Sequence, residues 1–440
     1  MKVLKFGGTS VGSPERIKNV SQLISDGTAQ IVVLSAMSGT TNSLVEIADY
    51  YYKGNNDAAA NVISKLEQKY HEVIGELLKT DAVRQKATAI ITREFTLIRS
   101  FAHKKFDLTG EKSILARGEI ISTNLVQLYH EEIGIQSVLL NALDFMRVDA
   151  DGEPILSEIE ERLTKVLAPY KDTKLFITQG FICVNPQGEI DNLKRGGSDY
   201  SASLIGAAIN AEAVEIWTDI DGIHNNDPRI VKNTQPIAEL SFDEAAELAY
   251  FGAKILHPAT VLPAKVKNIP VLLKNTMEPK AIGTTISNKI TNKGIKAVAA
   301  KDGLTVIRIK SGRMLLAYGF LRRVFEIFEK YKTSIDMITT SEVAISLTID
   351  KHDYVAQIVE ELKHLGTVEV ETEQTIVCIV GNMINEKQGY AADVLHALRT
   401  LPVRMISFGG SRHNISIVVE STYKEQALIA LHEHLFCSKN

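Results

Sequence analysis

The sequence has little cysteine and no long apolar run. Its three cysteines, Cys183, Cys378 and Cys437, are widely separated and lack the spacing of metal ligands. We therefore expect neither a disulfide framework nor a zinc site, and a reducing compartment suits this composition. No segment approaches the roughly 20 apolar residues that a membrane helix requires, and the opening residues MKVLKFGGTS do not resemble a signal peptide. These absences predict a cytoplasmic protein without a membrane partner.

The sequence also lacks a strong excess of either charge. Among 440 residues, 49 are Lys or Arg and 53 are Asp or Glu, so the formal net charge is −4, with both signs mixed along the chain. This composition argues against a nucleic-acid partner, although a local cationic pocket remains compatible with it. The length exceeds that of one ordinary hydrophobic core, and we expect two or three domains.

Short apolar runs alternate with longer amphipathic stretches through the first two thirds of the chain. The predicted strands are Val3–Phe6, Ile31–Leu34, Val138–Leu140, Leu175–Thr178, Val214–Trp217 and Val271–Leu273. The predicted helices include Pro14–Leu23, Leu44–Tyr52, Glu111–Tyr129 and Tyr200–Ile209, with a helix-rich segment at Asp57–Phe106. Almost continuously apolar strands are typical of a parallel sheet that is buried on both faces. The pattern predicts an α/β sandwich whose ligands lie beyond the carboxyl ends of the strands.

The last third contains two similar units at an offset of about 70 residues. LTVIRIKSG at Leu304–Gly312 matches QTIVCIVGN at Gln374–Asn382, and AISLTID from Ala344 matches NISIVVE from Asn414. Each unit predicts a strand–helix–strand–strand order, which is a small α+β module. Because one such module is too small to cover both faces of its sheet, we expect pairing within the chain or across a dimer, for regulation or assembly.

Glycines follow the first predicted strand in the segment KFGGTSVGSPE. They let backbone N–H groups approach phosphate oxygens, and Ser13-Pro14 begins a helix whose N-terminus favours an anion. The segment is not a P-loop, because Ser13-Pro14 replaces the Lys-Ser/Thr pair of that motif. Lys5 instead precedes the glycines, where its ammonium group can reach the β- and γ-phosphates of a nucleotide. An ordinary strand–turn–helix with a solvated lysine explains this segment equally well.

Three later segments each allow a functional and an ordinary interpretation. In LKRGGSDYSAS, Arg195 precedes a glycine loop and a capped helix, where its guanidinium can grip a carboxylate. In WTDIDGIHNNDPR, Thr218 and Asp219 follow an apolar strand, and Arg229 can meet phosphate. In FGAKILHP, Lys254 can neutralise phosphate. The ordinary alternatives are a surface arginine, a loop of turn-forming residues and a snorkelling lysine.

Together these segments resemble the aspartate kinases (aspartokinases) of the amino acid kinase family. The match covers essentially the whole chain, and the motifs follow the order of that group: KFGGTSVG, ARGE, ITQGFI, RGGSDY, WTDxDGI…DPR and FGAKxLHP. Segments like RGGSD recur in related kinases for glutamate, acetylglutamate and uridylate, whereas KFGGTSVG, WTD…DPR and FGAKxLHP are narrower. The resemblance implies an amino-acid-kinase-type αβα sandwich with a mainly parallel sheet, followed by two α+β (ACT-like) modules of the lysine-sensitive type.

The resemblance also implies a role for each matching residue. The implied catalytic residues are Lys5, Arg195 and Asp199. The implied aspartate-binding residues are Thr41, Glu119, Phe181, Arg195, Ser198 and Asp199. The implied ATP-binding residues are Lys5, Gly7, Gly8, Thr218, Asp219, His224, Arg229 and Lys254. His224 departs from the pattern, since similar enzymes often carry tyrosine near the adenine, and this leaves the nucleotide affinity open.

The implied reaction is ATP-dependent phosphorylation of the side-chain carboxylate of L-aspartate to 4-phospho-L-aspartate, the first step of lysine, threonine and methionine biosynthesis. The nucleophile has a side-chain pKa of about 3.9 and is ionised at neutral pH, so no general base is needed. The obstacle is repulsion between this carboxylate and the polyphosphate, which cations, Mg²⁺ and backbone N–H groups offset. ATP is the expected co-substrate and Mg²⁺ the expected cofactor, with the metal ligands left open.

The same resemblance implies a domain organisation and a regulator. The kinase domain is expected at residues 1–285, the first ACT-like module at 311–374, and the second at 295–310 plus 375–440. The implied effector-binding residues are Met314, Gly319, Phe320, Leu321, Ser334, Asp336, Ser341 and Glu342. Their carboxylates suit a dibasic effector such as L-lysine, so we expect inhibition by lysine. We also expect a homodimer or higher homo-oligomer formed through the ACT modules.

Two other functions fit the sequence less well. Another amino acid kinase, such as one acting on glutamate, differs only in its substrate, and the narrow motifs favour aspartate. A catalytically silent amino-acid sensor is disfavoured because Lys5, Arg195, Asp199 and Lys254 are all retained. A fusion to homoserine dehydrogenase is not expected, since no dinucleotide-binding domain follows Asn440.

Overall fold

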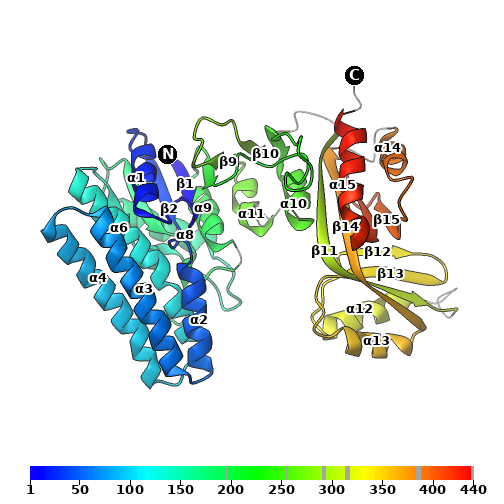
Figure 1. The fold of residues 1–440 in the computed structure, drawn as a ribbon, viewed down its shortest axis with the longest axis horizontal. Helices are drawn as coiled ribbons and strands as arrows, with labels where there is room; N and C mark the ends of the chain where they lie inside the picture. Colours follow the sequence, from blue (N-terminus) through cyan, green and yellow to red (C-terminus); the bar gives the residue numbers. More distant parts are fainter. Residues whose placement is uncertain are drawn as a thin grey trace. The chain divides into compact units, whose positions relative to one another are not determined.

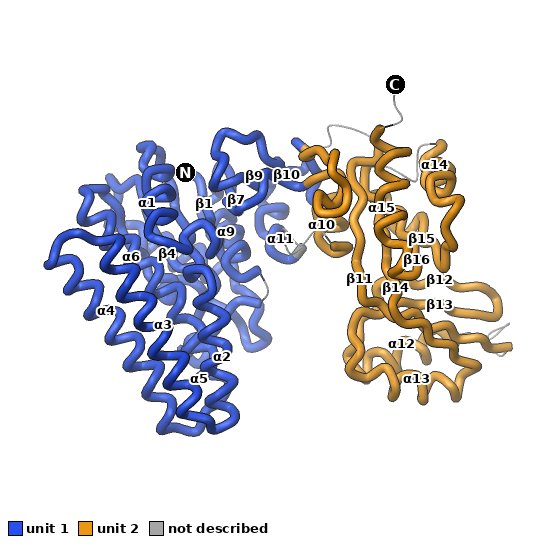
Figure 2. Tube along the Cα trace, in the orientation of Figure 1, with its two compact units in different colours: residues 1–223, 238–242, 256–288 blue, residues 224–237, 243–255, 289–440 orange. Residues whose placement is uncertain are grey.

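The chain divides into two compact units (Figure 2). Unit 1 comprises residues 1–223, 238–242 and 256–288, and unit 2 comprises residues 224–237, 243–255 and 289–440. The computed structural model describes residues 1–194, 196–252, 256, 258–289, 294–312, 318–382 and 388–437. Within these ranges, no helix is both long and apolar enough to cross a membrane.

An eight-stranded sheet forms the centre of unit 1 (Figure 1). In spatial order its strands are β3 (Val138–Leu140), β4 (Leu175–Gln179), β2 (Gln30–Leu34), β1 (Lys2–Phe6), β7 (Val214–Thr218), β9 (Val271–Asn275), β10 (Thr284–Ser287) and β8 (Glu239–Ser241). The first six are parallel, whereas β10 runs antiparallel to β9 and parallel to β8. Every strand predicted from an apolar run is present, so the mainly parallel sheet is confirmed. A small hairpin, β5 (Ile182–Val184) and β6 (Ile190–Asn192), follows β4.

Helices lie on both faces of this sheet (Figure 1). One layer contains α1 (Pro14–Leu23) and α6 (Arg117–Ile133), and the other contains α8 (Leu156–Leu167), α9 (Gly197–Ala208) and α11 (Pro258–Val266). The predicted start of α1 is confirmed, because Ser13 Oγ accepts the Arg16 N–H at 3.3 Å and Pro14 occupies the first turn. The single helix expected at Glu111–Tyr129 is instead two, α5 (Leu108–Leu115) and α6. The apolar periodicity of the sequence continues from α5 into α6. The pattern therefore does not reveal the one-residue turn at Ala116 that separates the two helices.

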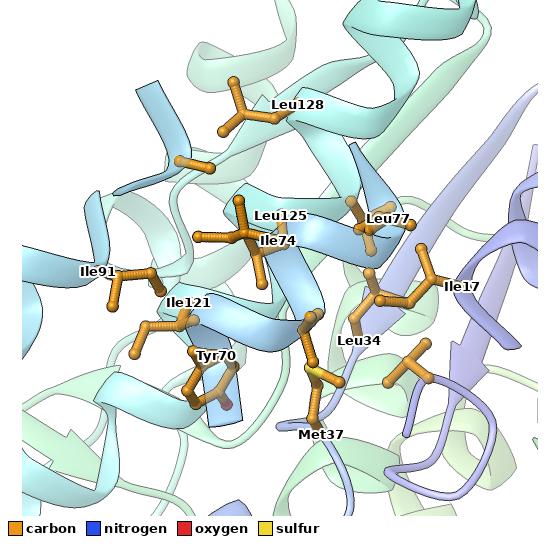
Figure 3. Close-up of a cluster of buried hydrophobic side chains, with 14 of the residues drawn as sticks. Ile17, Leu34, Met37, Tyr70, Ile74, Leu77, Ile91, Ile121, Leu125 and Leu128 are labelled. Atoms are coloured by element: carbon orange, nitrogen blue, oxygen red, sulfur yellow. The ribbon is translucent and has the colours of Figure 1, made fainter. Parts of the chain in front are cut away.

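The expected helix-rich segment contains two long helices, α3 (Asn56–Leu77) and α4 (Asp81–Ser100), which follow α2 (Thr40–Tyr52). They meet α1, α6 and the sheet in one hydrophobic core (Figure 3), whose members include Ile17, Leu34, Met37, Tyr70, Ile74, Leu77, Ile91, Ile121, Leu125 and Leu128. Fully burying such a side chain contributes roughly 1.5–3 kcal/mol. This core therefore anchors the helices whose ends carry the candidate site.

A six-stranded antiparallel sheet forms most of unit 2 (Figure 1). In spatial order its strands are β12 (Met337–Thr340), β13 (Ala344–Ile349), β11 (Gly294–Lys310), β14 (Thr367–Asn382), β16 (Asn414–Glu420) and β15 (Met405–Phe408). The helices of this unit are α10 (Phe242–Tyr250), which begins at the last residue of a unit 1 segment, α12 (Phe320–Lys330), α13 (Val355–Lys363), α14 (Tyr390–Ala397) and α15 (Lys424–His432). The α+β character expected of the last third is confirmed.

Two hydrophobic clusters pack on this sheet. The first contains α12, α13, β13 and the second half of β11, and the other contains α14, α15, β16 and the second half of β14. Strands β11 and β14 pair along almost their whole lengths and so belong to both halves of the sheet. Residues 304–310 were assigned from the sequence to the second module, yet Ile307 and Ile309 pack in the first cluster. The boundaries at 285, 311 and 375 remain predictions.

Candidate active site

Lys5 and Asp199 form an ion pair at the carboxyl edge of the sheet in unit 1. Side chains alternate along a strand, so Leu4 and Phe6 enter the hydrophobic core while Lys5 lies on the opposite face. Asp199, in the first turn of α9, places Oδ1 2.7 Å from Lys5 Nζ. The two side chains are only 12% and 15% exposed, and their attraction is therefore stronger than in bulk water.

The glycine turn follows directly after Lys5. The Gly7 N–H donates to the Trp217 carbonyl oxygen of β7 at 3.3 Å, and the Ser10 N–H donates back to the Gly7 carbonyl at 2.9 Å. A Cβ atom at Gly7 would lie 3.5 Å from Lys5 Nζ, so the turn runs beside the ammonium group. A turn of this kind at the start of α1 can present backbone N–H groups to an anion next to a cation.

Ala36 lies between two of the motif glycines. A Cβ atom at Gly8 would come within 2.8 Å of the Ala36 carbonyl oxygen, and one at Gly118 within 2.7 Å of the Ala36 side chain. Only glycine therefore permits the amino-terminal turn and α6 to approach this loop so closely. The loop after β2 thus packs between the KFGG and ARGE motifs. Ala36 itself is not among the site residues predicted from the sequence.

Glu119 is a buried carboxyl group at the start of α6. It is 4% exposed, and its Oε1 accepts the Ala36 N–H at 3.2 Å, while Oε2 has no hydrogen-bond partner among the described residues. Burial raises the pKa of Glu119 to about 7, although the Ala36 N–H and the Lys5 charge act in the opposite direction. Because only one oxygen of this buried carboxylate has a hydrogen-bond partner among the described residues, a cationic ligand such as an ammonium group would stabilise its charged form.

The Gly180–Phe181 turn packs against the start of α9. A Cβ atom at Gly180 would lie 2.6 Å from Ser198, and Phe181 has a positive φ of 68°. Its N–H donates to Ser201 Oγ at 2.9 Å, which holds the unusual backbone in place. The turn after β4 and the Ser198–Asp199 helix start therefore form one wall of the site.

Three predicted residues of unit 1 have less definite surroundings. Thr41 is exposed in the first turn of α2. Thr218 ends β7, where its hydroxyl donates to Asp219 Oδ1 at 3.1 Å, and Asp219 is exposed. Arg195, Lys254 and Met314 lie outside the described residues, so their predicted roles have no structural account.

Sequence reasoning missed a polar group at the carboxyl end of β9. Lys274 places Nζ 4.8 Å from the centre of the Trp217 ring, and Thr276 Oγ1 lies 2.8 Å from Ser10 Oγ of the glycine turn. The Thr276 N–H also donates to the Thr218 carbonyl at 2.8 Å. The signal was the polar KNT sequence directly after the apolar run Val271–Leu273, at the edge where ligands are expected.

Two predicted nucleotide residues, His224 and Arg229, belong to unit 2. His224 Nδ1 lies 2.8 Å from Thr234 Oγ1. The Arg229 guanidinium makes a bidentate pair with Asp227, at 2.9 and 2.7 Å, and is 84% exposed. Within unit 2 their loop is fixed to α15, because Asn226 Nδ2 donates to the Leu428 carbonyl at 3.0 Å.

Three of the predicted effector residues lie next to the ends of β12. Asp336 precedes the strand, and its Oδ1 accepts the Tyr250 hydroxyl at 2.6 Å and pairs with Lys301 Nζ at 2.8 Å. Ser341 and Glu342 follow the strand and are exposed. Elsewhere in the unit, Gly319 is the N-cap of α12 with φ 76°, Phe320 is buried, and Leu321 and Ser334 are exposed. One chain therefore does not gather Asp336 with Ser341 and Glu342.

In the parts of the chain that the structure describes, no three His, Cys, Asp or Glu side chains form a group able to hold a metal ion. The site instead offers a cation and backbone N–H groups for phosphate, and a buried carboxylate for an ammonium group. The fold and the site together place the chain among the α/β enzymes that bind small charged ligands at the carboxyl edge of a parallel sheet.

Comparisons with known proteins identify the family. The model of the amino acid kinase family matches residues 1–275, and an ACT domain model matches residues 377–435. The chain belongs to the amino acid kinase family.

Relatives and solved structures match over the whole length. The chain is 36% identical to the lysine-sensitive aspartokinase 3 of Escherichia coli (strain K12), with 99% of each chain covered. It is similar to the crystal structure of E. coli aspartokinase III in complex with aspartate and ADP (R-state), with TM-score 0.83, 34% identity and coverage of 99% and 100%. The complex of that enzyme with lysine and aspartate (T-state) gives TM-score 0.80, 34% identity and 99% coverage of both chains.

Proposed function

We propose that this chain transfers the γ-phosphoryl group of ATP to the side-chain carboxylate of L-aspartate, which yields 4-phospho-L-aspartate and ADP. The observation that carries this proposal is the Lys5–Asp199 pair beside the buried Glu119. The full-length similarity to a lysine-sensitive aspartokinase supports the same substrate. The reaction opens lysine, threonine and methionine biosynthesis, and we place it in the cytoplasm.

Each side chain of the site has a separate task in this mechanism. Glu119 receives the ammonium group of aspartate, and Arg195, Ser198 and the Phe181 turn receive its carboxylates. Thr41 completes the substrate pocket. The β-carboxylate oxygen attacks the γ-phosphorus while the bond from that phosphorus to the leaving oxygen of ADP breaks. No proton is removed, because the nucleophile is already ionised.

Lys5 stabilises the transferring phosphoryl group, and Asp199 holds its ammonium group in place through the 2.7 Å contact. Positive charge near the equatorial oxygens of a loose transition state is the main catalytic requirement of phosphoryl transfer. Gly7 and Gly8 allow the backbone to approach the same phosphate. Within unit 1, Thr218 and Asp219 contribute further to nucleotide binding, and the sequence resemblance implies the same role for His224, Arg229 and Lys254.

Mg²⁺ is proposed to enter with the nucleotide. The described residues contain no dedicated metal cluster, and Mg²⁺ in kinases is often held by substrate phosphates, waters and one or two carboxylates. The exposed carboxylate of Asp219, at the end of β7, suits contact with metal-bound waters. The ion supplies charge that offsets the repulsion between aspartate and ATP.

We further propose that L-lysine inhibits the enzyme through unit 2. The effector residues are those predicted from the sequence, from Met314 to Glu342, and the ACT modules form a homodimer or a higher homo-oligomer. Asp336 and Glu342 lie at opposite ends of β12, so a second chain is needed to complete a site that uses both.

A hydroxamate assay tests the proposed function. Wild-type protein with ATP, Mg²⁺ and aspartate is expected to form aspartyl hydroxamate, and added lysine is expected to reduce the rate. A preference for glutamate over aspartate would identify another amino acid kinase. If neither amino acid gives a product, the remaining interpretation is a catalytically silent amino-acid sensor. No response to lysine would refute the proposed regulation.

A variant of Lys5 tests the mechanism in the same assay. Lys5→Ala is expected to lower kcat by about 100-fold or more because it removes charge from the transition state. The matched control is Lys2→Ala, at the other end of the same strand, where Nζ pairs with Glu215 at 3.1 Å. A folded Lys5→Ala protein with a near-normal rate would refute the role of Lys5, and circular dichroism reports the folding.

A further inference from the structure

Gln179 is a buried amide that ends β4 and uses both ends of its side chain. Its Oε1 accepts the Ala142 N–H at 2.8 Å, at the start of the short helix α7 (Ala142–Phe145). Its Nε2 donates to Thr123 Oγ1, also at 2.8 Å. Gln179 is 3% exposed, and a buried amide without these partners would lose hydrogen bonds that water cannot replace. These bonds therefore hold the side chain in one orientation.

The direction of each hydrogen bond follows from the chemistry of the groups. A backbone N–H only donates, so the amide oxygen must face Ala142 and the NH₂ group must face Thr123. The Thr123 hydroxyl accepts that bond and directs its own hydrogen to the Glu119 carbonyl at 2.9 Å, with the Ile120 carbonyl at 3.2 Å. A continuous link thus runs from Gln179 through Thr123 to the backbone of Glu119.

Each end of this link meets an element of the proposed aspartate site. Glu119 carries the buried carboxylate in the first turn of α6. Gln179 directly precedes the Gly180–Phe181 turn, which is bonded to Ser201 and packs against Ser198 at the start of α9. The link therefore joins the helix that offers a carboxylate to the turn that borders the anion-binding helix start.

We propose that Gln179 and Thr123 are positioning residues that set the separation of Glu119 from the Phe181 turn. Aspartate must bridge these two elements, since its ammonium group and its carboxylates are bound at opposite sides. This inference rests on the proposed function because it concerns the affinity of the same site. A changed separation weakens aspartate binding, whereas Lys5, which lies on β1 and acts on phosphate, takes no part in the link.

Thr123→Val tests the link because valine has the shape of threonine without its hydroxyl. We expect the aspartate KM to rise by about 5- to 30-fold, the cost of one broken buried hydrogen bond. The ATP KM is expected to stay within about twofold and kcat within about threefold. Thr123→Ser, which restores the hydroxyl, is expected to return the aspartate KM to near the wild-type value.

Thr164→Val is the matched control. Thr164 is an exposed residue of α8 whose hydroxyl donates to the Glu160 carbonyl at 2.8 Å. Thr123 makes the same kind of bond within its helix, but only Thr123 also accepts a bond from a glutamine side chain. Thr164→Val is expected to leave both KM values unchanged. If Thr123→Val does not fold, Gln179→Met tests the same link, since methionine has a similar length and cannot donate to Thr123.

Several outcomes would overturn the inference. A folded Thr123→Val protein with wild-type aspartate KM would show that the link does not position the site. An equal rise of the aspartate and ATP KM values, or a failure of Thr123→Ser to rescue, would indicate a general structural effect. Failure of the wild-type enzyme to phosphorylate aspartate would instead refute the proposed function, so the two results are distinguishable.

Discussion

The carboxyl group of Glu119 is buried with one oxygen bonded to Ala36 and the other without a partner among the described residues. Burial favours the neutral form of such a group, and the raised pKa of about 7 expresses that preference. An arriving ammonium group restores the charged form, so substrate binding itself relieves the cost of burial. At the scale of single residues, the ionised form of Glu119 is thus unfavourable until an ammonium group binds to it.

We expect Glu119→Gln to stabilise the fold at alkaline pH while it weakens aspartate binding. The pKa of Glu119 rises from 4.5 to about 7 in the folded chain, so the folded state binds the proton more tightly. Its contribution to stability is complete below pH 4.5 and is lost as the pH rises through 7. Glutamine cannot ionise, so its advantage in unfolding free energy grows to the order of 3 kcal/mol at pH 8.

Thermal unfolding at pH 5 and pH 8 measures this difference, and the aspartate KM is expected to rise at least about 10-fold at neutral pH because the attraction for the ammonium group is lost. Glu46→Gln, on an exposed position of α2, serves as control. A Tm difference between wild type and Glu119→Gln that does not change with pH would contradict the assignment.

At the scale of elements, α6 is held against the loop after β2 by close packing. The Gly118 position leaves no room for a side chain beside Ala36, and the next residue is Glu119. The helix is fixed further by Arg117, which is buried and bonded to Glu94 of α4 at 3.0 Å. Any displacement of α6 therefore also displaces the Glu119 carboxylate.

We expect Gly118→Ala to destabilise the protein by about 1–3 kcal/mol and to raise the aspartate KM. Its Cβ atom would lie 2.7 Å from the Ala36 side chain, so α6 has to move. Gly75→Ala is the matched control, because Gly75 is an exposed glycine of α3 with nothing within 4 Å of an added Cβ. It is expected to stabilise by about 0.5–1 kcal/mol. Chemical denaturation compares the two, and equal effects would disprove the packing constraint.

At the scale of the molecule, the loops expected to bind nucleotide and the regulatory sheet are connected within unit 2. Helix α10 ends just before the FGAK motif, and its side chains bond to the sheet region at three places. Glu244 pairs with Lys296 at 2.9 Å, Glu247 accepts bonds from Ser411 and Asn414, and Tyr250 donates to Asp336. A change at Asp336 therefore acts directly on the end of α10.

We expect Tyr250→Phe to raise the lysine concentration for half-inhibition by about 3- to 10-fold, since one charged hydrogen bond couples α10 to Asp336. Basal kcat is expected to stay within about twofold of wild type. Tyr52→Phe is the control, because Tyr52 donates a similar bond to Glu111 at 2.9 Å in unit 1. An unchanged inhibition curve for Tyr250→Phe would exclude α10 from the coupling.

The fold class and the positions of the main strands follow from the amino-acid sequence alone. Strands such as Gln30–Leu34 are buried on both faces, so they must be continuously apolar, and that pattern is visible without a structure. The glycine motifs were visible for a similar reason, since they mark turns where a side chain has no room. The resemblance to aspartate kinases then indicated the site residues, whose roles remain predictions.

Contacts between residues that are distant in the sequence follow instead from the packing of the strands and helices. Ala36 lies between Gly8 and Gly118, and Thr276 lies beside Ser10, contacts that depend on the order of parallel strands rather than on any local pattern. The same holds for β11, which contributes Val298 to one hydrophobic cluster and Ile307 and Ile309 to the other, and which pairs with β14 along both halves. A local pattern reports whether a residue is buried. Which residue it is buried against depends on how the strands and helices pack.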